Sequence, residues 1–352
     1  MQRLGTRCRF RDLARAMAVL FATSPWLPVA AQNCAVTSVG FTPLNDLGSG
    51  LYRGAQGGLY PGGMNTQPAG HLAAGAALAQ AMTPRNASGS PDPEQGSIVL
   101  MSVGMSNTTQ EFSAFVPLAM GEPLRNPRLV VVDAAQGGQD AVDIANPAAP
   151  YWSTVDARLA QNNVTPAQVQ AVWLKEAIRQ GAIPDTSFAQ DATFLQEKLQ
   201  TIVQIIKSRY PNTVLVYLSS RIYAGYATST LNPEPIAYQS GFAVKWLIEA
   251  QIDGAAALNY DPAKGPVVAP WLAWGPYLWG DGLTPRSDGL VWSCSDFAAD
   301  GTHPGTTGRD KVAQMLLGFF KSDPTARFFF LDTVSDAASS ARTWGEVKAL
   351  YR

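Results

Sequence analysis

Residues 97–112 constrain the fold of this chain more than any other stretch. They open with a continuous apolar and β-branched run, pass through Gly104, and continue with apolar residues at helical spacing. This pattern predicts a buried strand, a sharp turn and a helix. Ser106 falls where the strand gives way to the helix, a place where free backbone N–H groups favour negative charge. Ser106 is therefore a candidate nucleophile. The alternative is that Ser106 and Thr108 only cap the helix, since Thr108 and Glu111 fit a capping box.

Apolar runs alternate with helical patterns along the rest of the chain. Further strands are predicted at 128–132, 169–174 and 213–218, and amphipathic helices at 71–82, 195–210, 235–252 and 312–320. Strands separated by helices are typical of a parallel sheet covered by helices. The sequence has no internal repeat and no long linker, so we expect one domain over residues 32–352.

The N-terminus is first basic and then apolar. Five arginines within the first 15 residues precede an apolar run at 16–31 that ends in small residues, which is typical of a secretory signal peptide. A membrane anchor is the alternative, but the run is shorter than the roughly 20 residues that span a bilayer. We expect a mature chain that begins at Gln32 and is secreted or periplasmic, with no membrane span.

Composition excludes some classes of partner. With 46% hydrophobic and 15% charged residues, the chain has the balance of a globular protein with a large core. Removing residues 1–31 changes the formal charge from −1 to −5, because five Arg and one Asp are lost. A mildly acidic chain is a poor candidate for binding nucleic acid.

Cys34 and Cys294 are the cysteines that remain once Cys8 is removed with the signal peptide. They can form a disulfide or remain two free thiols, since spacing alone does not decide. We predict the disulfide, because a secreted chain matures in an oxidising compartment. With only two histidines and no clustered His/Cys spacing, we expect no zinc site.

Asp300 and His303 form the second chemical motif. Their separation of three residues lets the aspartate accept from the imidazole Nδ1–H, so that Nε2 faces outward as a base. Singly, they would be a helix start and a surface histidine. Together with Ser106 they predict a catalytic triad, because triads are arrangements in space rather than in sequence. His71, at the start of a predicted helix, is expected to be structural.

Three blocks of this chain resemble the SGNH, or GDSL, hydrolases over roughly residues 97–321. They are Gly104-Met105-Ser106-Asn107, the strand-end Gly138, and Asp300-Gly301-Thr302-His303-Pro304. The resemblance implies that Ser106 is the nucleophile, His303 the general base and Asp300 its orienter. It also implies that the N–H groups of Ser106 and Gly138 form the oxyanion hole.

The sequence departs from that family in two blocks. Met105 stands where the family has aspartate, and the asparagine of the third block has no clear counterpart. At that strand end the chain has Lys175 and Glu176 instead. Lys175 either donates to the oxyanion or pairs with an acidic residue, and the sequence favours neither.

Residues 270–282 concentrate aromatic side chains between Pro and Gly residues. This composition predicts an irregular loop. Its indoles, Trp271, Trp274 and Trp279, are candidates to contact a sugar ring or an acyl group. The alternative, a small satellite core under a long loop, fits the sequence at least as well.

Together these features predict a flavodoxin-like α/β sandwich with its site at the carboxyl ends of the parallel strands. The predicted function is a secreted serine esterase that hydrolyses an acyl or acetyl ester of a small molecule or glycan, with no cofactor and no metal. An O-acyltransferase acting on a glycan and an inactive carbohydrate-binding protein are the alternatives. The oligomeric state is not predicted.

Overall fold

The computed structural model describes residues 31–179 and 188–332. The predicted signal peptide, apart from Ala31, lies outside the described residues, so its assignment stays a prediction. Among the described helices, none combines the length and the apolar character that crossing a bilayer requires.

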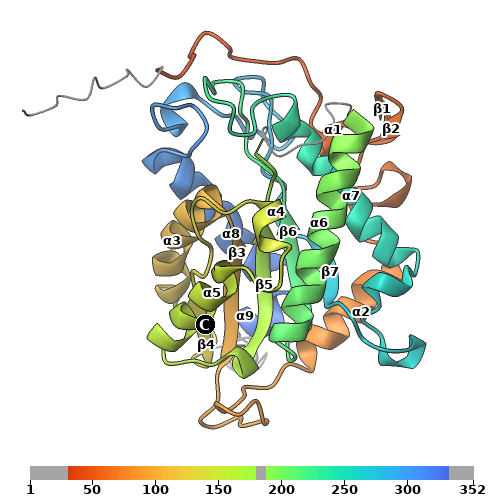
Figure 1. The fold of residues 1–352 in the computed structure, drawn as a ribbon, viewed down its shortest axis with the longest axis vertical. Coiled ribbons are helices and arrows are strands. Elements are labelled where there is room, and N and C mark those ends of the chain that lie inside the picture. The colour runs from red at the N-terminus through yellow and green to blue at the C-terminus, as the bar shows by residue number, and fades with distance from the viewer. Residues whose placement is uncertain (1–30, 180–187, 333–352) are drawn as a thin grey trace, which may run out of the picture.

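Five parallel strands form the central sheet (Figure 1). Their bounds are β3 Ile98–Gly104, β4 Leu129–Val132, β5 Val169–Lys175, β6 Leu215–Ser219 and β7 Trp271–Trp274. The order across the sheet is β4-β3-β5-β6-β7. Numbered along the chain this is 2-1-3-4-5, the flavodoxin-like order, in which ligands bind where the strand order reverses. The predicted fold class is confirmed, and the reversal lies between β3 and β5.

Helices cover both faces of the sheet. On one face α3 (Ser106–Met120) packs against α8 (Thr306–Ser322), which is joined there by α9 (Arg327–Phe330) and α2 (Ala69–Gln80). On the other face α6 (Phe188–Arg209) packs against α7 (Ile236–Ile252) and α4 (Ala141–Ile144), beside α5 (Pro150–Gln161). Before these elements come α1 (Leu44–Leu47) and the antiparallel pair β1 (Leu51–Tyr52) and β2 (Ala55–Gln56).

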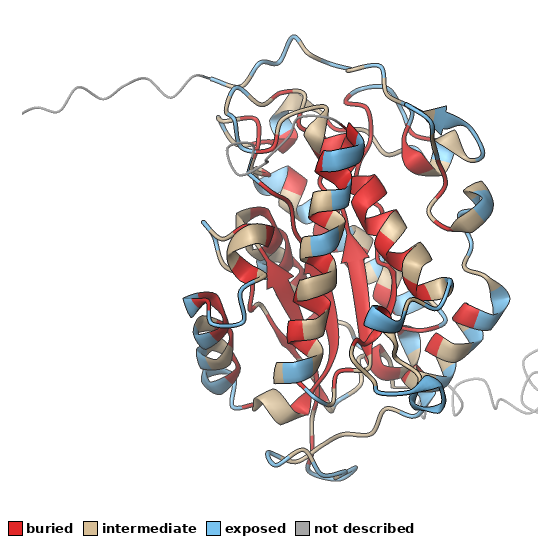
Figure 2. Cartoon of the chain, turned by 45° about the vertical axis from the view of Figure 1, so that its right-hand side comes forward, coloured by how far each residue is buried: buried red, intermediate tan, exposed pale blue. Residues whose placement is uncertain are grey.

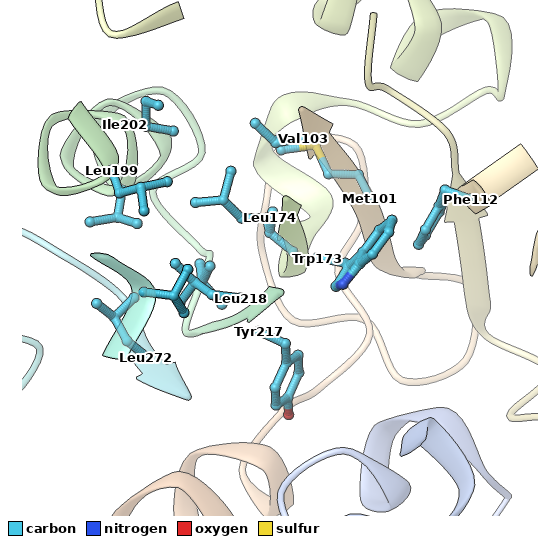
Figure 3. Close-up of a cluster of buried hydrophobic side chains, with 14 of the residues drawn as sticks. Met101, Val103, Phe112, Trp173, Leu174, Leu199, Ile202, Tyr217, Leu218 and Leu272 are labelled. Atoms are coloured by element: carbon cyan, nitrogen blue, oxygen red, sulfur yellow. The ribbon is translucent and has the colours of Figure 1, made fainter. Parts of the chain in front are cut away.

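The core lies between the sheet and its two helical layers. Every residue of β3, β5, β6 and β7 is buried, as the largely apolar runs of β3, β5 and β6 predict, whereas the outer faces of the helices are exposed (Figure 2). On the α3 side, Phe112 stacks on Trp173 with ring centroids 5.5 Å apart (Figure 3). On the other side, Leu199 and Ile202 of α6 are buried against the sheet.

Strand β7 and helix α5 are the clearest differences from the sequence prediction. Trp271–Trp274 is the fifth strand rather than an irregular loop, because its backbone pairs with β6 along the whole of its four residues. Helix α5 was not predicted, although Pro150 at its first turn and buried Tyr151, Val155 and Leu159 on one face are helix signals. The bounds of the other predicted strands and helices agree to within about two residues, except that α6 and α8 begin well before the predicted 195 and 312, at Phe188 and Thr306.

A disulfide joins Cys34 to Cys294, as predicted. It fastens the first described residues to the segment that leads to Asp300. Two hydrogen bonds extend this contact, from Gln32 N to Ala299 O (2.7 Å) and from Asn33 N to Tyr226 O (2.9 Å).

We expect the variant Cys34→Ser/Cys294→Ser to lose about 2 to 4 kcal/mol of unfolding free energy, because the bridge restricts the unfolded chain over a long loop. Urea denaturation of the two proteins measures the difference. Alkylation is the accompanying check: the untreated mature protein should not gain mass with iodoacetamide. Two alkylated thiols would contradict the bridge.

Candidate active site

Ser106 is the first residue of α3 and follows β3 after a single intervening residue. The turn requires glycine at position 104, where φ is +152° and a Cβ would lie 2.2 Å from the Lys175 carbonyl oxygen. Because the first N–H groups of a helix have no acceptor within it, the N–H of Ser106 is available to a ligand.

The capping-box alternative for this turn is wrong. The N-cap is Met105, and no side chain caps the helix there. The Thr108 hydroxyl instead donates to the Lys175 carbonyl oxygen (2.6 Å), and Glu111 forms an ion pair with the Lys175 ammonium group. Both side chains fasten α3 to β5, and Ser106 is left facing the pocket.

Ser106 meets His303 and Asp300 although 197 residues separate it from His303 in the sequence. The Ser106 hydroxyl lies 2.8 Å from His303 Nε2, and His303 Nδ1 lies 2.5 Å from Asp300 Oδ2. These distances allow proton transfer from the serine to the imidazole, with the aspartate orienting the ring. The predicted side chains therefore have the geometry of a Ser-His-Asp triad.

The surroundings of the Asp300 carboxyl group favour its ionised form. Partial burial by itself raises the pKa of Asp300, but the hydrogen bond from the His303 ring and those from the backbone N–H groups of His303 and Thr302 outweigh burial. The net pKa lies below its ordinary value. Asp300 Oδ1 accepts from both backbone N–H groups at 3.0 Å, which leaves Oδ2 for the imidazole.

The loop that carries His303 is held from two sides. At Gly301, where φ is +66°, a Cβ would lie 2.0 Å from the Tyr226 carbonyl oxygen, so only glycine fits. The Thr302 carbonyl oxygen accepts from Asn107 Nδ2 (3.1 Å) and Arg221 Nη2 (3.3 Å). Because Asn107 follows Ser106 directly, this contact couples the position of the histidine loop to that of the serine.

The loop after β4 lies beside Ser106. A Cβ at Gly137 would lie 3.6 Å from the Ser106 Cβ, and Gly138, with φ +76°, lines the same pocket. A network under this loop fixes its path. Asp133 accepts from the hydroxyls of Ser102 (2.6 Å), Thr109 (2.5 Å) and Ser113 (2.7 Å).

A pocket of about 270 Å³ opens at this edge of the sheet, at the carboxyl ends of β3, β4, β5 and β6. Ser106, His303 and Gly138 contribute to one part of it. The pocket is also lined by apolar and polar side chains: Met105, Ala177, Ile178, Leu231, Asn107, Gln139, Asp140, Arg179, Arg221, Asn232 and Thr302. Asp140 is the cap of α4 and pairs with Arg179 at 3.2 Å, so this acid is not a second free base.

Lys175 does not line this pocket, which corrects its predicted place in the oxyanion hole. Its side chain is fully buried beneath α3, where the ammonium group pairs with the equally buried Glu111. Burial lowers the pKa of Lys175 to about 8 and raises the pKa of Glu111, whereas their mutual attraction favours the charged forms. The alternative prediction, a structural pair with an acid, describes the observed contact.

The three candidate tryptophans do not line the pocket either. Trp271 and Trp279 are fully buried and Trp274 is 3% exposed. Each indole N–H is already bonded, to the His71 carbonyl oxygen, the Glu234 carboxylate and the Leu59 carbonyl oxygen respectively. All three tryptophans belong to the hydrophobic core, which agrees with the alternative prediction that this segment packs as a core. His71 is also structural, since its Nε2 lies 2.8 Å from the Leu272 carbonyl oxygen.

Sequence reasoning missed several residues of the site. Asn107 stands beside the identified serine, and Arg221 follows β6 within two residues, so the rule that ligands bind at the carboxyl ends of parallel strands signals both. Ile178 and Asn232 gave no comparable signal, because pocket walls depend on packing. Within residues 31–179 and 188–332, no group of three His, Cys, Asp or Glu side chains is placed to hold a metal ion.

A scan of family models and a search of curated proteins find no match. Among solved structures, a candidate SGNH hydrolase from Slackia heliotrinireducens is 17% identical with a TM-score of 0.31, covering 64% of this chain and 99% of that one. A carbohydrate esterase family 3 structure from Talaromyces cellulolyticus is 12% identical with a TM-score of 0.36, covering 62% and 94%. Because these TM-scores are low, the reaction is inferred from the side chains of the site alone.

Proposed function

We propose that this protein is a serine esterase that hydrolyses an acyl ester through a covalent acyl-enzyme. The observation that carries the proposal is the contact of 2.8 Å between the Ser106 hydroxyl and His303 Nε2, with Asp300 on the other ring nitrogen. A serine is a weak nucleophile unless a positioned base takes its proton. A purely structural role for Ser106 does not explain why a histidine and an aspartate are aligned beside its hydroxyl in an open pocket.

In the proposed reaction, Ser106 Oγ attacks the ester carbonyl carbon and its proton passes to His303 Nε2. The tetrahedral intermediate collapses, the alcohol leaves with the proton from His303, and the acyl group remains on Ser106. Water then attacks the acyl-enzyme while His303 takes its proton. The acid is released when Ser106 recovers that proton, so the enzyme ends unchanged.

The oxyanion of both intermediates requires donors beside Ser106. The N–H of Ser106, at the first turn of α3, and the N–H of Gly138, in the adjoining loop, are the donors we assign. With Lys175 buried under α3, no third donor is assigned at the end of β5.

The pocket supports an acyl substrate more than a sugar ring. Its apolar wall is formed by Met105, Ala177, Ile178 and Leu231, and no tryptophan of the described residues lines it. The disulfide is consistent with a secreted or periplasmic enzyme, the location that the basic and apolar N-terminal segment predicts.

A fluorophosphonate probe and a panel of nitrophenyl esters test the proposal. The probe should label the peptide that contains Ser106, because only an activated hydroxyl displaces fluoride from phosphorus at a useful rate. Ser106→Ala should lose both labelling and ester hydrolysis, and His303→Ala should lose most of each. Ser322→Ala is the matched control, since its hydroxyl merely donates to the Gly318 carbonyl oxygen on the exposed side of α8.

Hydrolysis that persists in Ser106→Ala would end the assignment of the nucleophile. Two alternative functions give different results. An acyltransferase would move the acyl group to an added sugar hydroxyl in preference to water, which the ratio of transferred ester to free acid measures. An inactive binding protein would show neither labelling nor turnover.

A further inference from the structure

The pocket beside Ser106 ends at a wall formed by Ile178 and Asn232. Both residues line the pocket, and both also line a separate void of about 10 Å³ behind it. Ile178 is 3% exposed and Asn232 is 5% exposed, so the wall is closed. Asn232 Nδ2 donates to the Ile178 carbonyl oxygen at 3.1 Å, which joins the segment after β5 to the loop after β6.

The void lies between α6 and α7. Beyond the wall it is lined by Asp191, Ala192, Leu195, Ile236, Gln239 and Ser240. Gln239 Nε2 donates to the Tyr52 hydroxyl (3.0 Å), and the Ser240 hydroxyl donates to the Ala237 carbonyl oxygen (2.6 Å). Because the Gln239 and Ser240 groups are already bonded, the surface left for an incoming chain is that of Ala192, Leu195 and Ile236 beside the buried Asp191 carboxylate.

The two ends of the pocket lie toward opposite faces of the sheet. His303 precedes α8, which packs with α3 on one face, whereas the void lies between α6 and α7 on the other (Figure 1). The imidazole that takes the serine proton later protonates the leaving alcohol, so the alcohol departs on the His303 side. An acyl chain that leaves Ser106 on the side away from His303 would meet the Ile178 side of the pocket.

We propose that Ile178 sets the maximum length of the acyl chain, making the enzyme selective for esters of short apolar acids. This inference rests on the proposed esterase function. A short chain fills the space between Ser106 and the wall, in contact with Met105, Ala177 and Leu231. A longer chain meets the side chain of Ile178, which is packed into the core and cannot move aside without opening a cavity.

Ile178→Ala removes the wall side chain beyond Cβ and joins the pocket to the void. We expect the ratio of kcat/KM for nitrophenyl octanoate to that for nitrophenyl butyrate to rise at least about 10-fold, since one methylene in an apolar pocket changes kcat/KM by roughly 10- to 200-fold. Ile178→Val removes a single carbon and should change the ratio in the same direction by less. Titration of active sites with the fluorophosphonate probe corrects each rate for unfolded protein.

Leu195→Ala is the matched control, because Leu195 lines the void but not the pocket. It enlarges the void and leaves the wall in place, so the ratio should equal that of the wild type. The double variant Ile178→Ala/Leu195→Ala should favour octanoate beyond Ile178→Ala alone.

The outcomes separate this inference from the proposal beneath it. A wild type that hydrolyses esters, with the same ratio in Ile178→Ala and Ile178→Val, overturns the role of Ile178 and leaves the esterase intact. A wild type that already prefers octanoate also overturns it. A wild type with neither probe labelling nor hydrolysis overturns the esterase and the acyl-length inference together.

Discussion

Replacing Asp300 by asparagine is expected to lower kcat by about 10⁴ while the fold is retained, as the wrong histidine tautomer does in triads of this type. The reason lies in how the two carboxylate oxygens are used. Oδ1 accepts from the backbone N–H groups of Thr302 and His303, and an asparagine carbonyl oxygen can keep both bonds. The amide nitrogen then takes the place of Oδ2 and donates to His303 Nδ1. The imidazole proton is forced onto Nε2, which can no longer accept from Ser106.

Ester hydrolysis under single-turnover conditions measures this loss, and thermal unfolding checks the fold. KM should change little, because Asp300 does not line the pocket. His71→Ala is the control, since the His71 ring bonds the Leu272 carbonyl oxygen in the core and has no path to Ser106. A loss in Asp300→Asn of less than about 10-fold would mean that the tautomer is set by another group.

The strands that are buried on both faces of the sheet were the best predicted from the sequence. The strands at 98–104, 169–175 and 215–219 are continuous apolar runs, and such runs leave few alternatives in an α/β chain. Strand β7 was missed because four residues between Pro and Gly carry no period. Only pairing with β6, a tertiary contact, makes them a strand.

Contacts between residues close in the sequence were predictable in this site. The direction in which a strand's side chain points was not. Asp300 and His303 are three residues apart, so their contact follows from sequence spacing. Lys175 stands at the correct strand end but on the face covered by α3, the face that Trp173 also occupies two residues earlier. Alternation along β5 could have identified that face, since Phe112 and Glu111 of α3 pack against Trp173 and Lys175 there.

The ion pair between Lys175 and Glu111 leads to the second large prediction: Lys175→Met should lower the free energy of unfolding by about 3 to 5 kcal/mol. Both side chains are 0% exposed, and in the variant Glu111 would lose its bonded cation while it remained buried. Burial already raises the pKa of Glu111, so the lone acid would be held in an unfavourable environment in either protonation state.

The double variant Glu111→Leu/Lys175→Met distinguishes the pair from mere packing. It removes both polar groups and keeps a similar volume, so its stability should return to within about 1 to 2 kcal/mol of the wild type or exceed it. Urea denaturation of the wild type, the two single variants Glu111→Leu and Lys175→Met, and the double variant gives the coupling energy between the two residues.

The activity of Lys175→Met should stay within the range of the wild type at temperatures where it is folded, because Lys175 lies under α3 and outside the pocket. A fall in kcat of about 10² with unchanged stability would contradict this, since that is the effect of losing an oxyanion donor. In that case the Lys175 ammonium group would have to reach the substrate at the edge of the sheet between β3 and β5. Because α3 covers Lys175, α3 would have to move during catalysis.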